Sequence, residues 1–159
     1  NEDIVRYSRD AFNLLIGEKT AEEVKISIGS AYSLREVMTH SIRGRDLVSG
    51  LPKEIVATDE QIREALSHSI RIIVNNIKTI IEETPPELLS DIFQRGIILA
   101  GGGSLIRGLD RLLANQTGIP VRMMEDPLTA VVRGTGVVLE DMERLKEVLV
   151  EDHRGTPLR

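Results

Sequence analysis

A short apolar run that ends in three consecutive glycines restricts the folds open to this chain. The run Ile97 to Ala100 is too short for a helix and is typical of a strand buried in a parallel sheet. The turn Gly101-Gly102-Gly103-Ser104 then opens a predicted helix that Gly118 closes. Its inward side is predicted to carry Leu105, Leu109, Leu112 and Leu113. With Ile119 to Met123 as the next strand, these residues form a right-handed βαβ unit, so we expect an α/β fold with two parallel neighbouring strands.

Composition narrows the class of protein further. The 159 residues are 41% hydrophobic and 28% charged, which suits one domain or a domain with a small satellite lobe. Aromatic residues make up only 3%, so the core must be aliphatic and an immunoglobulin-like sandwich is disfavoured. The net charge of −5 includes no basic block, which argues against nucleic acid as a partner. Cysteine is absent, and no apolar run reaches the roughly 18 residues that span a bilayer.

The first residues are predicted to form two helices. Apolar side chains recur at helical spacing over residues 2–16, and Gly17 suits the left-handed position at a helix end. Thr20 and Glu23 have the spacing of a capping box, so a second helix is expected to begin at Ala21.

A β-hairpin and a long helix are predicted next. Weak alternation over residues 34–43 and a β-rich run at residues 53–57 indicate two strands joined by a long loop. Thr58 and Gln61 form another capping box. The apolar stripe of the helix that follows consists of Ile62, Leu66, Ile70, Ile73, Ile77 and Ile80.

Prolines mark the boundaries of the last helices. Pro85-Pro86 ends the long helix, and a short helix over residues 87–94 leads into the βαβ unit. Asp126 as N-cap and Pro127 at the first helical position start the last helix. Its buried side is predicted to consist of Leu128, Val131, Thr135, Val138, Met142 and Leu145. Residues 151–159 are expected to be a frayed tail.

Two local patterns could bind a ligand. A triple glycine between a strand and a helix start lets the backbone approach a ligand, and free amides there attract anions or polar sugar groups. A tight turn without a ligand is an equally open interpretation of the same residues. Glu22 and Lys25, three apart on a predicted helix, are commonly a solvated ion pair, and a ligand-binding role is the alternative.

The residues of a complete catalytic or metal centre do not come together in the sequence. His40, His68 and His153 lie in different predicted elements without ligand spacing, so structural roles are favoured and no metal site is predicted. No serine lies in a recognisable nucleophile elbow, and local spacing pairs no two acids.

Five blocks that cover nearly the whole chain in order carry a family resemblance. They are residues 13–26, 43–52, 84–89, 99–113 and 126–136. Together they resemble the second domain, or C-terminal half, of the MreB family of bacterial actin-like cell-shape proteins. The glycine turn is shared with actin and Hsp70 relatives, whereas Arg43-Gly44-Arg45-Asp46-Leu47 with Gly50-Leu51-Pro52 separates MreB from them.

The resemblance implies an actin-like ATPase domain built from two lobes. Residues 1–19 and 68–150 would form an RNase H-like large lobe with a partial sheet. Residues 20–67 would form a small α+β tip lobe that contacts the next subunit of a filament.

The resemblance also implies a nucleotide site between these lobes. Gly101, Gly102 and Gly103 would pass close to the nucleoside of ATP, while Glu22 and Lys25 approach its base and ribose. Leu105 and Ile106 would pack near the adenine. No catalytic residue and no metal ligand is assigned to the chain.

The family's phosphate-binding hairpins and magnesium site are expected in the half of the protein that this sequence lacks. Because phosphoryl transfer depends on those groups, the chain alone is expected to be inactive, although the resemblance implies a slow, polymerisation-linked ATPase for the whole protein. Asn1 is accordingly expected to follow a cut.

The resemblance implies partners and a location as well. The expected partners are other filament subunits and a transmembrane protein of the RodZ type, without nucleic acid and without direct membrane contact by this part. The filaments would lie in the cytoplasm under the inner membrane and would organise peptidoglycan synthesis in rod-shaped cells. A sugar kinase or an Hsp70-type ATPase of the same superfamily is the alternative, because both share the glycine turn.

Overall fold

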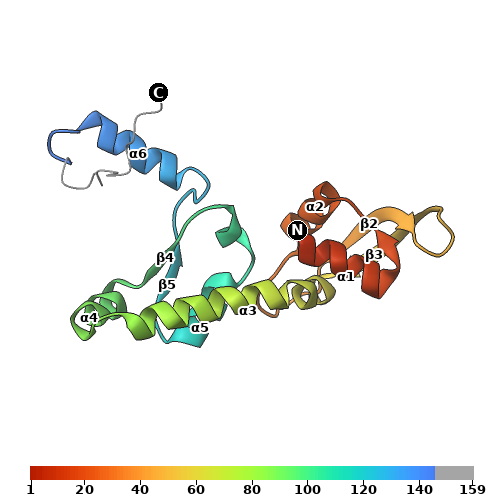
Figure 1. Cartoon of the computed structure of the whole chain (residues 1–159), viewed down its shortest axis with the longest axis horizontal. Helices are drawn as coiled ribbons and strands as arrows, with labels where there is room; N and C mark the ends of the chain where they lie inside the picture. Colours follow the sequence, from red (N-terminus) through yellow and green to blue (C-terminus); the bar gives the residue numbers. More distant parts are fainter. Residues whose placement is uncertain (146–159) are drawn as a thin grey trace, which may run out of the picture.

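The computed structural model describes residues 1–145, whose long axis runs from a β-hairpin at one end to a short helix at the other (Figure 1). The elements are α1 (Glu2–Phe12), β1 (Leu14–Leu15), α2 (Glu18–Ile28), β2 (Thr39–Asp46), β3 (Pro52–Thr58), α3 (Asp59–Glu83), α4 (Pro86–Arg95), β4 (Ile97–Leu99), a 3-10 helix η1 (Gly102–Leu105), α5 (Leu109–Thr117), β5 (Val121–Met123) and α6 (Ala130–Glu140). The strands form an antiparallel sheet, β1-β2-β3, and a parallel one, β4-β5. The predicted mixture of helices with a partial parallel sheet is confirmed, and the tail at residues 151–159 lies outside the described residues.

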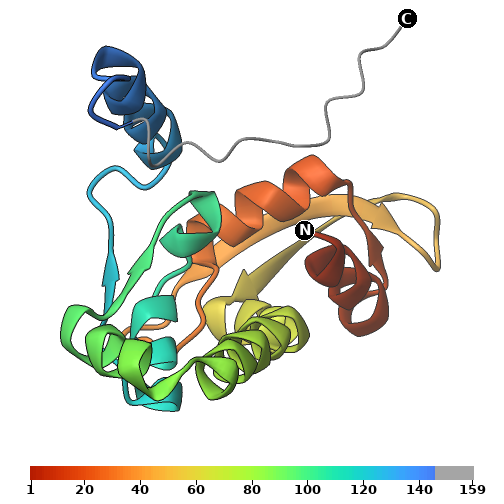
Figure 2. The ribbon, with the colours of Figure 1, turned by 60° about the vertical axis from the view of Figure 1, so that its left-hand side comes forward.

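The antiparallel sheet presents one face to helices and the other to solvent. β2 and β3 pair as the predicted hairpin, with Thr39 opposite Thr58 at its base. Side chains alternate along β2, so Ile42 is buried while Arg43 is exposed. α1, α2 and α3 lie on the buried face, with α2 against β2 and α3 against β3 (Figure 2).

The boundaries of the hairpin differ from the prediction. β2 was expected over residues 34–43, but it begins at Thr39 and continues to Asp46. The connecting loop is therefore shorter than predicted. It closes tightly because the Asp46 amide donates to the Leu51 carbonyl at 2.8 Å and Gly50 adopts a φ of 74°. The alternation of β2 could not show this, since the turn decides how far the ladder extends.

The capping box at the start of α3 is confirmed. The Thr58 hydroxyl accepts from the Gln61 amide, and the Gln61 side chain accepts from the Thr58 amide. The predicted apolar stripe is fully buried only in the first half of the helix, and Ile77 in the second half is partly buried against the core. Ile62, Leu66 and Ile70 are buried, whereas Ile73 and Ile80 are exposed.

One hydrophobic core joins the sheet to the helices on its buried face and reaches α5. The glycine-rich turn borders this core, because Ile106 packs against it. Among residues 1–145, the largest fully buried apolar side chains are those of Ile4, Leu14, Val24, Ile28, Ile42, Ile62, Leu113 and Ile119.

The predicted boundaries of the first two helices are wrong. α1 ends at Phe12, where Asn13 adopts the left-handed conformation with a φ of 52°. Residues 14–15 pair with β2 instead of continuing the helix, a tertiary contact that local periodicity does not reveal. α2 accordingly begins at Glu18 with Gly17 as N-cap, so the expected capping box lies inside the helix.

The parallel βαβ unit is confirmed, but its helix begins later than predicted. Ile97 pairs with Val121 and Leu99 with Met123. Gly118 is the left-handed cap at the end of α5. The glycine turn opens the short helix η1, and α5 begins only at residue 109. Of the predicted inward leucines, Leu109 and Leu113 are buried, Leu112 is partly buried, and Leu105 is exposed.

The last helix was placed wrongly at its start and on its buried side. Asp126 has a φ of 48°, residues 127–129 form a turn, and α6 begins at Ala130. Val131, expected in the core, is 75% exposed, and α6 contains no buried residue. In Figures 1 and 2 α6 stands apart from β4 and β5. Periodicity identifies an apolar side of a helix, but it does not identify what covers that side.

The division into two lobes at residues 19/20 and 67/68 remains a prediction. α1 packs against α2 and α3, and β1 pairs with β2, so residues 1–19 share the core of the hairpin lobe. α3 runs through the second boundary as one helix.

Candidate functional site: the glycine turn and helix α2

Gly101 fixes the turn that follows β4. Its φ of 81° and ψ of 167° belong to a region of backbone space that is practically restricted to glycine. Its amide donates to the Pro127 carbonyl at 2.7 Å, and its carbonyl accepts from the Ser104 hydroxyl at 2.7 Å. Ser104 is buried, so the turn is held from inside.

The next two glycines expose the backbone of the turn. Gly102 and Gly103 are both exposed. A Cβ at Gly103 would have no neighbour within 4 Å, and one at Gly102 would lie 3.2 Å from the Leu128 side chain. Leu105 is 47% exposed beside them, whereas Ile106 packs against the core. A flat ligand can therefore approach the peptide groups of the turn and the Leu105 side chain.

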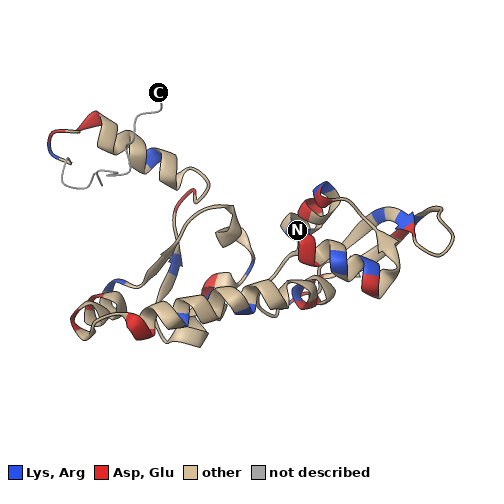
Figure 3. Ribbon diagram, viewed as in Figure 1, with Lys and Arg blue, Asp and Glu red and all other residues tan. Residues whose placement is uncertain are grey.

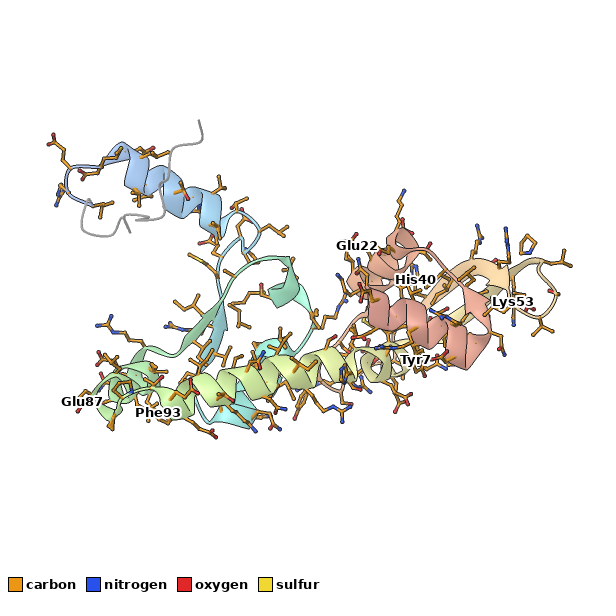
Figure 4. All side chains as sticks on the ribbon, in the orientation of Figure 1. Tyr7, Glu22, His40, Lys53, Glu87 and Phe93 are labelled. Carbon is orange, nitrogen blue, oxygen red and sulfur yellow. The ribbon has the colours of Figure 1, made fainter. Side chains whose placement is uncertain are left out.

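Glu22 and Lys25 lie on α2, which the resemblance predicts to be the other wall of the site. Glu22 is exposed and Lys25 is partly buried (Figure 4 labels Glu22). The Lys25 ammonium donates to the Asn1 side-chain carbonyl at 3.0 Å. Within the described part of the chain, Glu22 and Lys25 do not form an ion pair with each other, so the simple solvated pair is not observed.

Arg107 joins α2 to the segment of the glycine turn. Its guanidinium donates to the Ile26 carbonyl at 3.0 Å and to the Gly29 carbonyl at 3.5 Å. Its own carbonyl accepts from the Ala31 amide at 2.8 Å, and residues 30 and 107 form an isolated parallel bridge. Arg107 was not among the predicted site residues. The only available signal was an arginine three residues after the turn and directly before a glycine.

A buried polar cluster links the segment after α2, which Arg107 contacts, to helix α3. Asp59 pairs with Arg63 at 3.1 Å, and the same guanidinium donates to the Ser30 hydroxyl at 3.3 Å. Ser30 is fully buried and Asp59 is 4% exposed. The segment that follows α2 is therefore anchored to the start of α3.

The remaining polar groups lie away from the glycine turn. The Tyr7 hydroxyl donates to Glu64 at 2.9 Å beside a cavity of about 450 Å³ between α1 and α3. Burial, together with this bond to Glu64, raises the pKa of Tyr7. His40 bonds through Nδ1 to the Ser27 hydroxyl at 3.0 Å, which is a structural role, and His153 lies outside the described residues.

The hairpin carries two carboxyls with lowered pKa. The Val48 amide donates to Asp46 and is the main reason that the pKa of Asp46 lies below its ordinary value. The Ser41 hydroxyl, and after it Arg43, lowers the pKa of Glu54 in the same way. Both carboxyls are solvent-accessible.

Residues 1–145 contain neither a metal-ligand cluster nor a helix suited to cross a membrane. No three His, Cys, Asp or Glu side chains in this region are grouped so that they could hold a metal ion. None of the helices in this region has both the length and the apolar character that a bilayer span requires.

Comparison with known proteins decides the family. The sequence profile described as "MreB/Mbl protein" matches residues 1–147. The chain belongs to this family. It is 45% identical over 143 residues to the cell shape-determining protein Mbl of Bacillus subtilis, covering 90% of this chain and 43% of Mbl. It is 49% identical over 140 residues to the cell shape-determining protein MreB of Escherichia coli, covering 88% of this chain and 40% of MreB. The chain thus spans less than half the length of these curated MreB/Mbl relatives.

A solved MreB structure agrees with the fold. The chain matches MreB5 of Spiroplasma citri bound to ADP with a TM-score of 0.87 and 38% identity, over 92% of this chain and 44% of MreB5. The actin-like fold is therefore established for this MreB/Mbl chain. Membership of the family favours the cytoskeletal hypothesis over the sugar-kinase and Hsp70 alternatives.

Proposed function

We propose that this chain supplies the adenosine-binding wall of an ATP-binding, filament-forming, actin-like protein that determines cell shape. The observation that carries the proposal is the pairing of two features. The exposed backbone of Gly102 and Gly103 lies in a turn locked at Gly101, and Arg107 ties this turn to α2, which bears Glu22 and Lys25. The structures of MreB5 bound to ADP and to AMPPNP support a nucleotide as the ligand.

The chemistry of the turn favours recognition of the nucleoside over recognition of the phosphates. Backbone groups, Glu22 and the half-exposed Leu105 suit a base and a ribose. Tight binding of phosphates in proteins relies on charge-assisted contacts and a magnesium ion, which this proposal assigns to the rest of the protein. The chain alone should therefore bind ATP, ADP and adenosine with similar affinities, at about high micromolar to millimolar Kd.

Titration calorimetry with the three ligands, with and without magnesium, tests the nucleotide site. Similar weak binding of all three supports the proposal. A strong preference for magnesium-ATP, or sustained release of phosphate, would contradict the assignment of the phosphate site to the rest of the protein. No binding of any of them would contradict the site itself.

The surfaces at the two ends of the elongated molecule, the hairpin and helix α4, support self-association as the second part of the proposed function. The hairpin tip exposes Leu47, Val48 and Leu51, and residues 43–54 contain three basic and two acidic residues. At the opposite end, residues 80–95 contain four acidic residues and one arginine and expose Ile80, Leu88 and Phe93. Figure 3 shows acidic residues gathered on α4, and Figure 4 shows Glu87 and Phe93 at the end opposite Lys53.

Such ends suit a head-to-tail contact between subunits. Two different surfaces that complement each other on copies of one chain generate an open filament when the rotation does not close a ring. Sedimentation of the complete gene product with ATP tests this part of the proposal. Pelletable polymer is the expected result, and a monomer that transfers phosphate to a sugar would favour the kinase alternative.

A membrane-associated location and a RodZ-type partner complete the proposed function. We place the filaments in the cytoplasm beneath the inner membrane, where they would organise peptidoglycan synthesis. A transmembrane partner of the RodZ type would dock on the large-lobe surface of this chain. A pull-down with the cytoplasmic part of such a partner checks the contact, and failure to bind the chain would remove it.

A further inference from the structure

The end of helix α2 receives a cationic side chain from a segment far away in the sequence. The last carbonyls of a helix have no partner inside it and carry the negative end of its dipole. Two carbonyls at this end, those of Ile26 and Gly29, accept hydrogen bonds from the Arg107 guanidinium. Charge-assisted bonds of this kind are stronger than those between neutral groups.

The same end of α2 is fixed at Lys25. The Gly29 amide donates to the Lys25 carbonyl at 2.9 Å, and a Cβ on Gly29 would lie only 2.2 Å from that oxygen. Only glycine fits this close approach. The glycine that Arg107 contacts is therefore hydrogen-bonded directly to Lys25, on the helix that also carries Glu22.

The other side of the junction leads to the glycine turn. Arg107 lies three residues after Ser104, whose hydroxyl closes the turn onto the Gly101 carbonyl. Only two residues of the chain therefore separate Arg107 from Ser104, which closes the glycine turn by its hydrogen bond to Gly101. The segment after α2 is anchored to α3, because Ser30 is fully buried and its hydroxyl accepts a hydrogen bond from Arg63.

We propose that Arg107 is a positioning residue that sets the separation between α2, with Glu22 and Lys25, and the glycine turn. This inference rests on the proposed adenosine site. Arg107 itself acts on the helix end and not on the ligand. The backbone bond from Ala31 to Arg107 remains when the side chain is shortened, so the fold should survive its removal.

The test compares Arg107→Ala, Arg107→Lys and Arg111→Ala in the 159-residue chain. Arg111 is an exposed arginine in the first turn of helix α5, four residues after Arg107, and serves as the matched control. Arg107→Ala should weaken adenosine binding about tenfold, because it removes charged hydrogen bonds to two carbonyls. Arg107→Lys should recover part of this loss, and Arg111→Ala should change the Kd less than twofold. A Kd for Arg107→Ala within twofold of the unmodified chain would overturn the proposal.

A stability control separates positioning from general destabilisation. Val74→Ala removes buried methyl groups from α3, away from the turn. If Val74→Ala lowers Tm as much as Arg107→Ala and weakens adenosine binding equally, the role of Arg107 is merely structural and the proposal fails.

Amide exchange makes the outcome independent of the adenosine site. In Arg107→Ala the amide of Gly29 should exchange several-fold faster than in the unmodified chain, because the end of α2 is released. If the unmodified chain binds no adenosine, the proposed site fails while faster exchange still supports the junction. Unchanged exchange at Gly29 overturns the positioning role in either case.

Discussion

The Oδ1 atom of Asp59 accepts a hydrogen bond from the backbone amide of Met38 at 3.0 Å, and the Asp59 amide donates back to the Met38 carbonyl at 2.8 Å. This reciprocal pair holds the chain entering β2 against the first turn of α3. Arg63, one helical turn later, compensates the buried charge.

Replacement of Asp59 should therefore be costly. Asp59→Ala leaves the Met38 amide without its acceptor and the Arg63 guanidinium without its carboxylate partner, which should lower the free energy of unfolding by about 2–4 kcal/mol. Urea unfolding measures the loss. Glu60→Ala, at the exposed neighbouring position, should change stability by less than about 0.5 kcal/mol. An Asp59→Ala variant as stable as Glu60→Ala would show that the pair contributes little.

Gly108 is the second position where a small change should have a large effect. It has a φ of 73°, and a Cβ there would lie 2.6 Å from the Cβ of Tyr32. Gly108→Ala should thus cost about 2–3 kcal/mol, seen as a lower Tm in thermal unfolding. Gly103→Ala, where a Cβ meets nothing within 4 Å, is the matched control and should leave Tm nearly unchanged. Equal Tm values for the two variants would contradict the close packing at Tyr32.

Gly102 allows ligand binding to be tested separately from stability. Its backbone is exposed, and an added side chain meets only the Leu128 methyl at 3.2 Å. Gly102→Val should therefore fold, with a stability loss within about 1 kcal/mol, yet fill the space where the nucleoside meets the turn. We expect adenosine binding to fall below detection in ligand-observed NMR. Gly136→Val on α6, where a Cβ would have no neighbour within 4 Å, should bind normally, and normal binding by Gly102→Val would move the nucleoside away from the turn.

The hairpin should lose stability in acid. The pKa values of Asp46 and Glu54 are lowered in the folded chain, by the Val48 amide and by the Ser41 hydroxyl respectively. The unfolded chain then binds these protons at higher pH, so the stabilisation is complete above the unfolded pKa of about 4 and is lost as the pH falls through the folded values. Amide exchange at Val48, followed from pH 6 to pH 3, should accelerate relative to intrinsic rates. Asp46→Asn should flatten that dependence, and a flat profile in the unmodified chain would contradict it.

The sequence was sufficient where short-range chemistry decides the structure. The capping box at Thr58 and Gln61, the left-handed Gly118 and the parallel pairing of β4 with β5 all follow from local residue types. Tertiary contacts decided the rest. Residues 14–15 leave a helical pattern to pair with β2, and α6 has an apolar side that nothing in residues 1–145 covers.

In the candidate site, too, local sequence predicted some features, whereas contacts between distant segments decided others. Three glycines in a row after a strand predicted an exposed turn, which the structure contains, but the residue that requires a positive φ is Gly101 alone. The roles of Glu22, Lys25, Leu105 and Ile106 came from the resemblance and stay predictions. Beyond its place shortly after the turn, Arg107 had no sequence signal, because its contacts to Ile26 and Gly29 join segments that are 81 and 78 residues apart.

The last prediction concerns the contact between subunits. Arg45 is exposed on the solvent face of the hairpin, and Glu87 is exposed on α4 at the opposite end of the molecule (Figure 4). If these ends meet in a filament, Arg45→Glu and Glu87→Lys should each place like charges together and raise the critical concentration for polymerisation about three- to tenfold. The double variant restores opposite charges and should polymerise better than either single variant.

Arg111→Glu, which adds the same charge as Arg45→Glu but lies on α5, is the control for net charge. Light scattering of the complete gene product at low salt measures all four, since exposed charges are screened within about 10 Å at 0.1 M salt. Additive losses in the double variant would mean that Arg45 and Glu87 do not face each other across the contact.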